Sequence, residues 1–216
     1  MEIDRETYRI HVILYDLWKK TKAEISSFEK EELSKVKQSL KNYVDIAYQT
    51  IESNFNNTQN KQFLEAQYGF RLRNIIDIAA SVIEDEMKRV ESRAVSRAQA
   101  QADAMRIIKE IRYDGGTGYI WINDTGRPYP RMIMHPTLPE LDGTILDDPK
   151  YNCALGKKQN LFQAFVEVTS ASPEGDGFVD YLWPKPTKDG LTAEMPKLSY
   201  VKIFKPREWI VGTGVY

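Results

Sequence analysis

The chain has 216 residues, of which 42% are hydrophobic and 28% are charged, a balance that is ordinary for a folded protein of one or two domains. Lysine and arginine number 30 against 31 aspartates and glutamates, and this lack of a basic excess argues against a nucleic-acid-binding protein. The single cysteine, Cys153, excludes an internal disulfide, and no apolar run reaches the roughly 18 residues that a membrane span needs.

The N-terminal half predicts helix. Residues 5 to about 111 contain no proline and only one glycine, Gly69, and their apolar residues recur at helical spacing. We expect one break at 53–58, where Asn, Ser and Thr favour turns and caps, and a second near 92–96. An unbroken first helix of about 50 residues would measure about 75 Å. This is too long for a compact domain, so we expect the helix to project as a stalk.

The helical half contains an internal repeat. Residues 40–52 match residues 72–84 at an offset of 32, with the same residue type at seven of thirteen positions. Two explanations stay open, a duplication of the segment or the same amphipathic pattern arising twice. The Asn-x-x-Asp-Ile-Ala core that both copies share favours the duplication slightly.

From residue 119 onward the pattern changes to short strands separated by turns. These strands, together with the helical half, predict an α+β fold. Strands are expected at 119–124, 131–135, 177–183, 197–204 and 209–216, with a loop at 136–157 and a short helix at 161–168.

The chain is poor in catalytic groups. It has two histidines, His11 and His135, and no motif of a metalloprotease, a phosphate-binding loop or a serine hydrolase. The glycines at 115–118 precede a strand, whereas a dinucleotide-binding loop follows one. The neighbouring carboxylates at 147–148 lie in a loop before a proline and do not indicate a metal site. We therefore predict no enzymatic activity, no cofactor and no bound metal.

The expected strands are rich in the groups that a small anion requires. A carboxylate that leaves water needs a lysine or arginine as charged donor, and a short alkyl tail needs an apolar wall. Because alternate residues of a strand share a face, Tyr119 lies with Trp121, and Tyr181 lies with Trp183. Lys185 continues the second row if the intervening proline does not end the strand.

The strand at 197–204 presents two different faces. The alternation places Tyr200 and Lys202 with Leu198, and it places Lys197 on the other face with Ser199 and Val201. Each aromatic residue named here also suits a hydrophobic core, and Lys202 also suits the surface.

Five short signatures follow one another in the second half of the chain. In this order they resemble a Cache domain, and more narrowly the single-Cache type 2 that lies outside the cytoplasmic membrane in prokaryotic chemoreceptors and sensor histidine kinases. The resemblance implies long N-terminal helices packed on a PAS-like, five-stranded antiparallel sheet. Residues 1–111 would then form a helical support and residues 112–216 a ligand-binding sheet, together one sensor domain. The signatures are Tyr119-Ile-Trp-Ile-Asn-Asp124, Met134-His-Pro136, Tyr181-Leu-Trp-Pro-Lys-Pro186, Lys197-Leu-Ser-Tyr-Val-Lys202 and Trp209-Ile-Val-Gly-Thr-Gly-Val-Tyr216.

Domains of this kind bind two- and three-carbon carboxylates such as acetate, propionate, pyruvate or lactate. The resemblance therefore implies a sensor of small organic acids, with Lys197 and Lys185 as the favoured partners of the carboxylate. Carried over residue by residue, the implied ligand-binding positions are Tyr119, Trp121, Met134, His135, Tyr181, Trp183, Lys185, Lys197 and Tyr200.

The resemblance also implies a location outside the cytoplasmic membrane. In the family, one membrane helix lies just before the first helix and another soon after the last strand, so we interpret the chain as a sensor domain without these flanking segments. Similar proteins have one copy of the repeated segment, so the copy at 40–52 departs from the family pattern. We expect a homodimer through the N-terminal helix, along an apolar stripe of Ile10, Ile13, Leu14, Leu17 and Ile25.

Two other functions stay open. The domain could bind a different small solute, such as an amino acid, an amine or a urea-like molecule. A carboxylate of the protein would then be expected in the pocket, and the nearest candidate, Asp180, points away from the face of Tyr181. The domain could also lack a ligand and serve only to dimerise.

Overall fold

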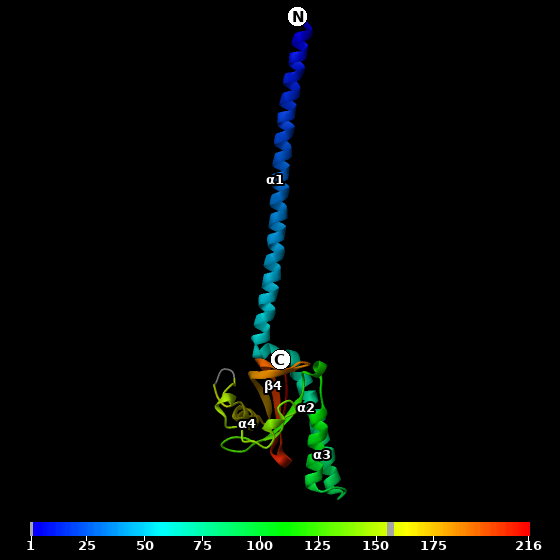
Figure 1. The fold of residues 1–216 in the computed structure, drawn as a ribbon, viewed down its shortest axis with the longest axis vertical. Coiled ribbons are helices and arrows are strands. Elements are labelled where there is room, and N and C mark those ends of the chain that lie inside the picture. Colours follow the sequence, from blue (N-terminus) through cyan, green and yellow to red (C-terminus); the bar gives the residue numbers. More distant parts are fainter. Residues whose placement is uncertain (1, 155–157) are drawn as a thin grey trace. The chain divides into compact units, whose positions relative to one another are not determined.

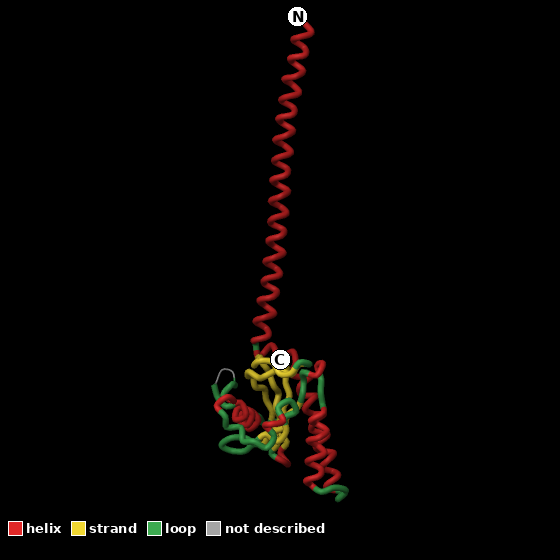
Figure 2. Tube along the Cα trace, in the orientation of Figure 1, coloured by secondary structure: helices red, strands yellow, loops and turns green. Residues whose placement is uncertain are grey.

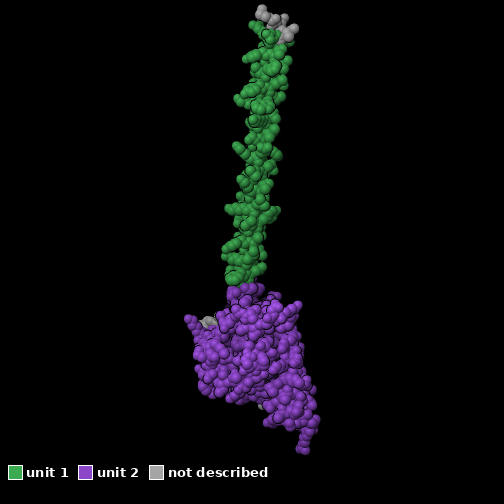
Figure 3. Space-filling view, in the orientation of Figure 1, with its two compact units in different colours: residues 1–56 green, residues 57–216 purple. Residues whose placement is uncertain are grey.

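The computed structural model describes residues 2–154 and 158–216. They form two compact units, residues 1–56 and residues 57–216, which Figure 3 distinguishes by colour. Figure 2 shows the helices, the strands and the loops between them, among which the connection from β2 to α4 is long. The helices are α1 (Glu2–Gln59), α2 (Lys61–Glu91), α3 (Arg97–Glu110) and α4 (Leu161–Ala171), and the strands are β1 (Ile120–Asp124), β2 (Met132–Met134), β3 (Asp176–Thr187), β4 (Gly190–Phe204) and β5 (Trp209–Val215).

Helix α1 is continuous over 58 residues, which corresponds to about 87 Å at 1.5 Å per residue. The predicted break at 53–58 is wrong, because α1 continues through these residues to Gln59. The chain leaves the helix at Asn60 instead, whose side chain accepts a hydrogen bond from the backbone N–H of Phe63 at 3.0 Å. One asparagine at the N-cap thus satisfies a backbone donor of the next helix.

The second predicted break is confirmed. Helix α2 ends at Glu91, and Ser96 caps α3 by accepting a hydrogen bond from the backbone N–H of Gln99 at 3.1 Å. One ion pair joins the two helices, since Arg89 on α2 lies 3.4 Å from Asp103 on α3; Arg89 also pairs with Glu86 of its own helix at 2.7 Å. Among the described helices, none combines the length and the apolar character that crossing a membrane requires.

The five strands form one antiparallel sheet in the order β2-β1-β5-β4-β3. This confirms the expected α+β fold with a five-stranded sheet. The hairpin of β3 and β4 is longer than expected, because β3 continues through Pro184 and Pro186 to Thr187. Since β3 is an edge strand and its register shifts between the two prolines, their missing N–H groups do not interrupt the sheet.

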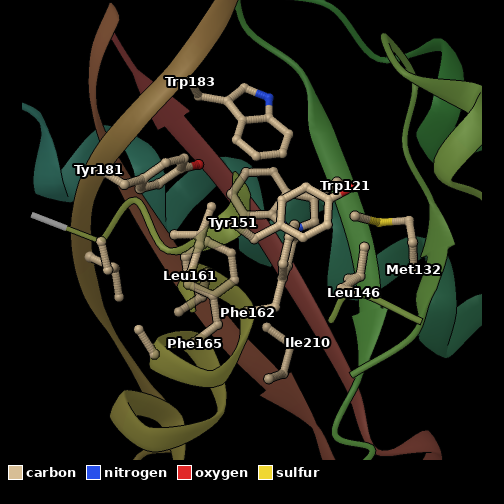
Figure 4. Packing of buried hydrophobic residues seen from close by; sticks show 14 of the residues in the cluster. Trp121, Met132, Leu146, Tyr151, Leu161, Phe162, Phe165, Tyr181, Trp183 and Ile210 are labelled. Atoms are coloured by element: carbon tan, nitrogen blue, oxygen red, sulfur yellow. The ribbon is translucent and has the colours of Figure 1, made fainter. Parts of the chain in front are cut away.

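The two faces of the sheet carry separate cores. Helices α2 and α3 cover one face, which we call the α2 face, and α4 with the loops before it covers the other, the α4 face (Figure 1). Alternation along β1 divides its residues between them, with Tyr119 and Trp121 on the α4 face and Ile120 and Ile122 on the α2 face. Figure 4 shows the α4-face core, in which most of the large residues are aromatic.

Candidate functional site

The centre of the candidate site is a buried lysine on β4. The Lys197 side chain is 3% exposed, and its ammonium group donates a hydrogen bond to the hydroxyl oxygen of Tyr119 at 2.8 Å. No carboxylate of the described residues forms an ion pair with it. Burial lowers the pKa of Lys197 well below its usual value, because no negative charge compensates for the loss of water. The site therefore holds a buried lysine that lacks a counter-ion, and a bound anion would favour its charged form.

Four aromatic rings surround this ammonium group. Its nitrogen lies 4.1 Å from the ring centre of Tyr119, 5.0 Å from Trp121, 4.9 Å from Tyr216 and 5.9 Å from Tyr181. The negative face of an aromatic ring attracts a cation, which offsets part of the cost of its burial. The rings carry no net charge, however, so an anion that enters this cage would meet an uncompensated positive charge.

Two glycines of β5 make room for the cage. A Cβ atom at Gly212 would collide with the indole of Trp121, and one at Gly214 would collide with the Ser199 hydroxyl and lie 3.0 Å from Cε of Lys197. These close contacts give a steric reason for the two glycines in the last signature. The glycines let the side chains of the neighbouring strands β1 and β4 lie flat across the backbone of β5.

His135 supplies a neutral polar group beside the cage. Its side chain is 2% exposed, and its ring centre lies 5.2 Å from that of Tyr119. Burial first, and then the charge of Lys197, lowers the pKa of His135 to about 3, so the imidazole is neutral at physiological pH. Its Nδ1 atom accepts a hydrogen bond from the backbone N–H of Leu138 at 3.1 Å. The proton of the neutral ring therefore resides on Nε2, which is left as a donor.

The tyrosine hydroxyls complete the polar lining. The hydroxyls of Tyr119 and Tyr216 lie 3.4 Å apart, and that of Tyr216 donates to the backbone oxygen of Pro184 at 2.7 Å. Burial raises the pKa of Tyr119 to about 12, so this residue stays protonated. Tyr181 and Ser199 form a hydrogen bond at 2.8 Å, which uses the Tyr181 hydroxyl within the protein.

The three tryptophans of the sheet strands have different surroundings. The Trp121 indole donates to Asn123 at 3.2 Å, so this side chain serves as a wall of the cage. Trp183 lies 5.8 Å from the ring of His135 and stacks on Tyr151 with ring centres 6.3 Å apart. Trp209 packs in the core of the α2 face.

The structure brings six of the nine predicted ligand-binding residues together, namely Tyr119, Trp121, His135, Tyr181, Trp183 and Lys197. Three lie elsewhere. Met134 and Tyr200 are buried in the core of the α2 face, across the sheet from Lys197. The Lys185 ammonium is at the edge, half-buried and 5.9 Å from the ring centre of Tyr216.

Tyr200 has partners of its own on the α2 face. Its hydroxyl donates to Asp176 at 2.6 Å, and the Arg73 guanidinium lies within hydrogen-bonding distance of both residues. Alternation along β4 had already placed Tyr200 and Lys197 on opposite faces, and the structure confirms that separation.

The sequence reasoning missed Tyr216, Asn123, Ser199 and Tyr151. The first three belong to signatures that were recognised, so a closer reading of strand alternation could have found them. Tyr151 comes from a loop, and no short-range pattern links it to Trp183.

Two cavities flank the cage. One of about 180 Å³ lies beside Trp183 and Tyr151, and one of about 100 Å³ is lined by Lys197 and Tyr216 together with Asp180 and the α2 residues Lys61 and Tyr68. Within the described residues no group of three or more His, Cys, Asp or Glu side chains is arranged to hold a metal ion. The cage itself combines the buried Lys197 side chain with four aromatic rings.

The comparison with protein families identifies the chain, because the sequence model of the Cache domain matches residues 18–216. The chain belongs to the Cache domain family. This confirms the family that the five signatures indicated. The methyl-accepting chemotaxis protein McpP of Pseudomonas putida is 36% identical over 150 residues, which are 68% of this chain and 24% of that protein. The chain thus spans about a quarter of the length of this curated relative.

Two solved structures are similar to this Cache domain. One, described as the periplasmic sensor domain of a chemotaxis protein, is 37% identical with a TM-score of 0.58, over 71% of this chain and 97% of that one. The other, described as the structural basis for carboxylic acid recognition by a Cache chemosensory domain, is 32% identical with a TM-score of 0.60, over 73% of this chain and 97% of that one. The relatives are thus sensor domains of chemotaxis proteins.

Proposed function

We propose that this Cache domain senses a small monocarboxylate of the acetate, propionate, pyruvate or lactate class. The observation that carries the proposal is Lys197, a lysine that is 3% exposed and has no carboxylate partner among the described residues. An isolated buried charge is costly, and a ligand that supplies the opposite charge removes that cost on binding. The carboxylate of the ligand would be the missing counter-ion.

The surrounding groups would orient such a ligand. Besides the ammonium of Lys197, the Nε2–H of His135 would donate to a carboxylate oxygen, and the hydroxyl of Tyr119 would do so by turning away from that of Tyr216, 3.4 Å away. The rings of Trp121 and Trp183 would face the short alkyl tail. An amino acid or an amine would bring its own positive charge next to Lys197. The candidate carboxylate for such a ligand, Asp180, lies 3.7 Å from Lys61.

The relatives support a proposal about the location. One similar structure is described as periplasmic and another as a chemosensory domain that recognises carboxylic acids. We propose the same setting here, an extracytoplasmic sensor domain of a membrane receptor whose output module lies outside this chain. That the helices of residues 1–111 and the sheet of residues 112–216 act as one sensor is part of this proposal. A ligand would act by shifting two populations of the domain, to an extent set by its difference in affinity for them.

The long helix is proposed as a dimerisation element. The exposed side chains of α1 include Ile10, Ile13, Leu14, Leu17 and Ile25, the stripe expected from the sequence. Farther along, exposed Leu33, Val44 and Phe55 are spaced 11 residues apart, as are Leu40 and Ile51. An 11-residue apolar repeat is typical of helices that wind around each other with a right-handed twist. Sedimentation equilibrium of the whole chain and of Val44→Asp tests the dimer, which the aspartate should weaken.

Thermal unfolding with a ligand panel tests the carboxylate assignment. A ligand at 100 times its Kd adds about 2.7 kcal/mol, which corresponds to a rise of roughly 5–10 °C in Tm for a domain of this size. We expect this rise with acetate, propionate, pyruvate or lactate. A rise only with amines, amino acids or urea would overturn the carboxylate assignment and keep the sensor. No rise with any solute would favour a domain that only dimerises.

A further inference from the structure

The 180 Å³ cavity beside Trp183 is separate from the cage of Lys197. Its inner wall is formed by the buried Trp183 and Tyr151 and the half-buried Leu138, Leu141 and Cys153, and its mouth carries the exposed Glu140, Lys150 and Glu194. The interior is thus apolar and the rim is charged. Neither Lys197 nor Tyr119, which form the cage, contributes to the lining of this cavity.

Trp183 is in contact with residues of the cage and also lines this cavity. On one side its ring lies 5.8 Å from His135 and 6.0 Å from Tyr181, both of which border the cage. On the other side it stacks on Tyr151 and lines the cavity. In Figure 4 the indole lies above Tyr151 and beside Tyr181, where it closes one end of the aromatic cluster.

We infer that Trp183 limits the length of the acid that the domain accepts. This inference rests on the proposed function. With the carboxylate on Lys197, the alkyl tail of a short acid ends at the indole, and a longer tail collides with it. Beyond the indole the chain already provides an apolar space of about 180 Å³. The tryptophan thus acts as a partition, and its size sets the specificity.

Replacing the tryptophan should join the two spaces. In Trp183→Ala, a longer tail would pass through the gap and bury its methylenes against Leu138, Leu141 and Cys153. Each buried methylene improves affinity by about fourfold, the factor that corresponds to 0.8 kcal/mol. Calorimetric titration with acetate, propionate, butyrate, pentanoate and hexanoate should therefore show the optimum moving from short to long acids. The affinity for hexanoate relative to propionate should rise at least tenfold.

Trp209 provides a matched control. It is buried to the same degree, 6% exposed against 7% for Trp183, but it packs on the α2 face. Trp209→Ala should lower stability without changing the order of preference among the acids. Trp183→Phe keeps most of the packing, and it should show a smaller shift in the same direction if the alanine variant does not fold.

Cys153 gives a second readout, because it is the only cysteine of the chain and it lines the cavity. In Trp183→Ala, pentanoate should protect Cys153 from a thiol reagent at least several-fold, whereas acetate should not. In the unsubstituted chain, acids that bind should leave Cys153 equally reactive.

The outcomes separate the inference from the proposed function. If the unsubstituted chain binds acetate or propionate but Trp183→Ala and Trp183→Phe weaken all acids by one common factor, the partition is wrong and the carboxylate sensor stands. A shift in preference with Trp209→Ala would also overturn the partition. If the unsubstituted chain binds none of the acids, both proposals fail.

Discussion

The two faces of the sheet differ in how the charges of their polar groups are balanced. On the α2 face, Tyr200, Asp176 and Arg73 satisfy one another, with a distance of 2.6 Å between the tyrosine hydroxyl and the carboxylate. On the α4 face, Lys197 has a tyrosine hydroxyl and four aromatic rings around it but no carboxylate among the described residues. Charge that is balanced within the chain stabilises the fold. Charge that is left unbalanced is available to a ligand.

This difference has an energetic consequence. A charge that is buried without a partner destabilises the empty domain, and the missing partner then binds more tightly because it relieves that cost. Removing a polar group should therefore lower stability on the α2 face. On the α4 face it should lower affinity.

The largest expected effect follows from removing the unbalanced charge. Lys197→Met should weaken carboxylate binding by about a thousandfold, since the loss of one partner of a buried charge pair costs about 3–5 kcal/mol. The same variant should raise the Tm of the empty domain, because an uncompensated charge is replaced by an apolar chain. Calorimetric titration and thermal unfolding measure the two effects.

Lys202→Met is the matched control for this prediction. Lys202 lies on the same strand, but it faces the α2 side and pairs with Asp77 at 3.1 Å. Affinity should stay within about twofold of the original, because an exposed ion pair contributes about 0–1 kcal/mol. An equal loss of binding in both variants would mean that the contrast between the two faces is wrong.

Side-chain packing on the α2 face should contribute to the stability of the domain and not to its affinity for the ligand. Leu72 on α2 is fully buried against the sheet, so Leu72→Ala should lower the free energy of unfolding by about 2–5 kcal/mol. Leu40, which occupies the same position in the other copy of the repeat, is 59% exposed. Leu40→Ala should change the free energy of unfolding by about 0.5 kcal/mol or less. Chemical denaturation, at a protein concentration at which the chain is monomeric, measures the free energy of unfolding of both variants. Similar losses of stability in the two variants would contradict the conclusion that only Leu72 packs in a core.

Two tyrosine hydroxyls, one on each face of the sheet, test the same difference between stability and affinity. Tyr200→Phe removes a hydrogen bond to the Asp176 carboxylate, which should cost about 1.5–3 kcal/mol of stability and leave affinity unchanged. Tyr119→Phe removes the hydroxyl that Lys197 contacts, and it should lower affinity for the carboxylate by about tenfold, the factor that corresponds to 1.4 kcal/mol. If Tyr200→Phe lowers affinity as much as Tyr119→Phe does, the α2 face takes part in binding.

The last prediction is a dependence of affinity on pH. Burial lowers the pKa of Lys197 in the empty domain, and a bound carboxylate would raise it again. Binding therefore takes up a proton at any pH between these two pKa values, and affinity falls by up to about tenfold per unit as pH rises through that window. His135, with a pKa of about 3, and Tyr119, with a pKa of about 12, keep their charge states at intermediate pH.

Calorimetry in buffers of different ionisation enthalpy measures this proton uptake. The uptake should vanish in Lys197→Met. Proton release on binding, or an affinity that rises with pH, would contradict the role of Lys197 as the counter-ion.

The sequence determined much of this protein. The order of the five signatures gave the family, and strand alternation separated Lys197 from Tyr200 and paired Tyr119 with Trp121. These features depend on local rules, since side chains alternate along a strand whatever lies beside it. These local rules do not determine which residues of neighbouring strands lie on the same side of the sheet. The carry-over from the family therefore included Met134 and Tyr200, which belong to the other side of the sheet.

The internal repeat shows what only the tertiary structure decided. Leu72, Ile76, Ala79 and Ile83 are at most 2% exposed, whereas their counterparts Leu40, Val44 and Ile51 are between 59% and 69% exposed. Nearly the same apolar stripe is buried in the second copy and exposed to solvent in the first. Periodicity fixes which residues of a helix share a face, but burial requires a partner surface, which the sheet supplies to the second copy.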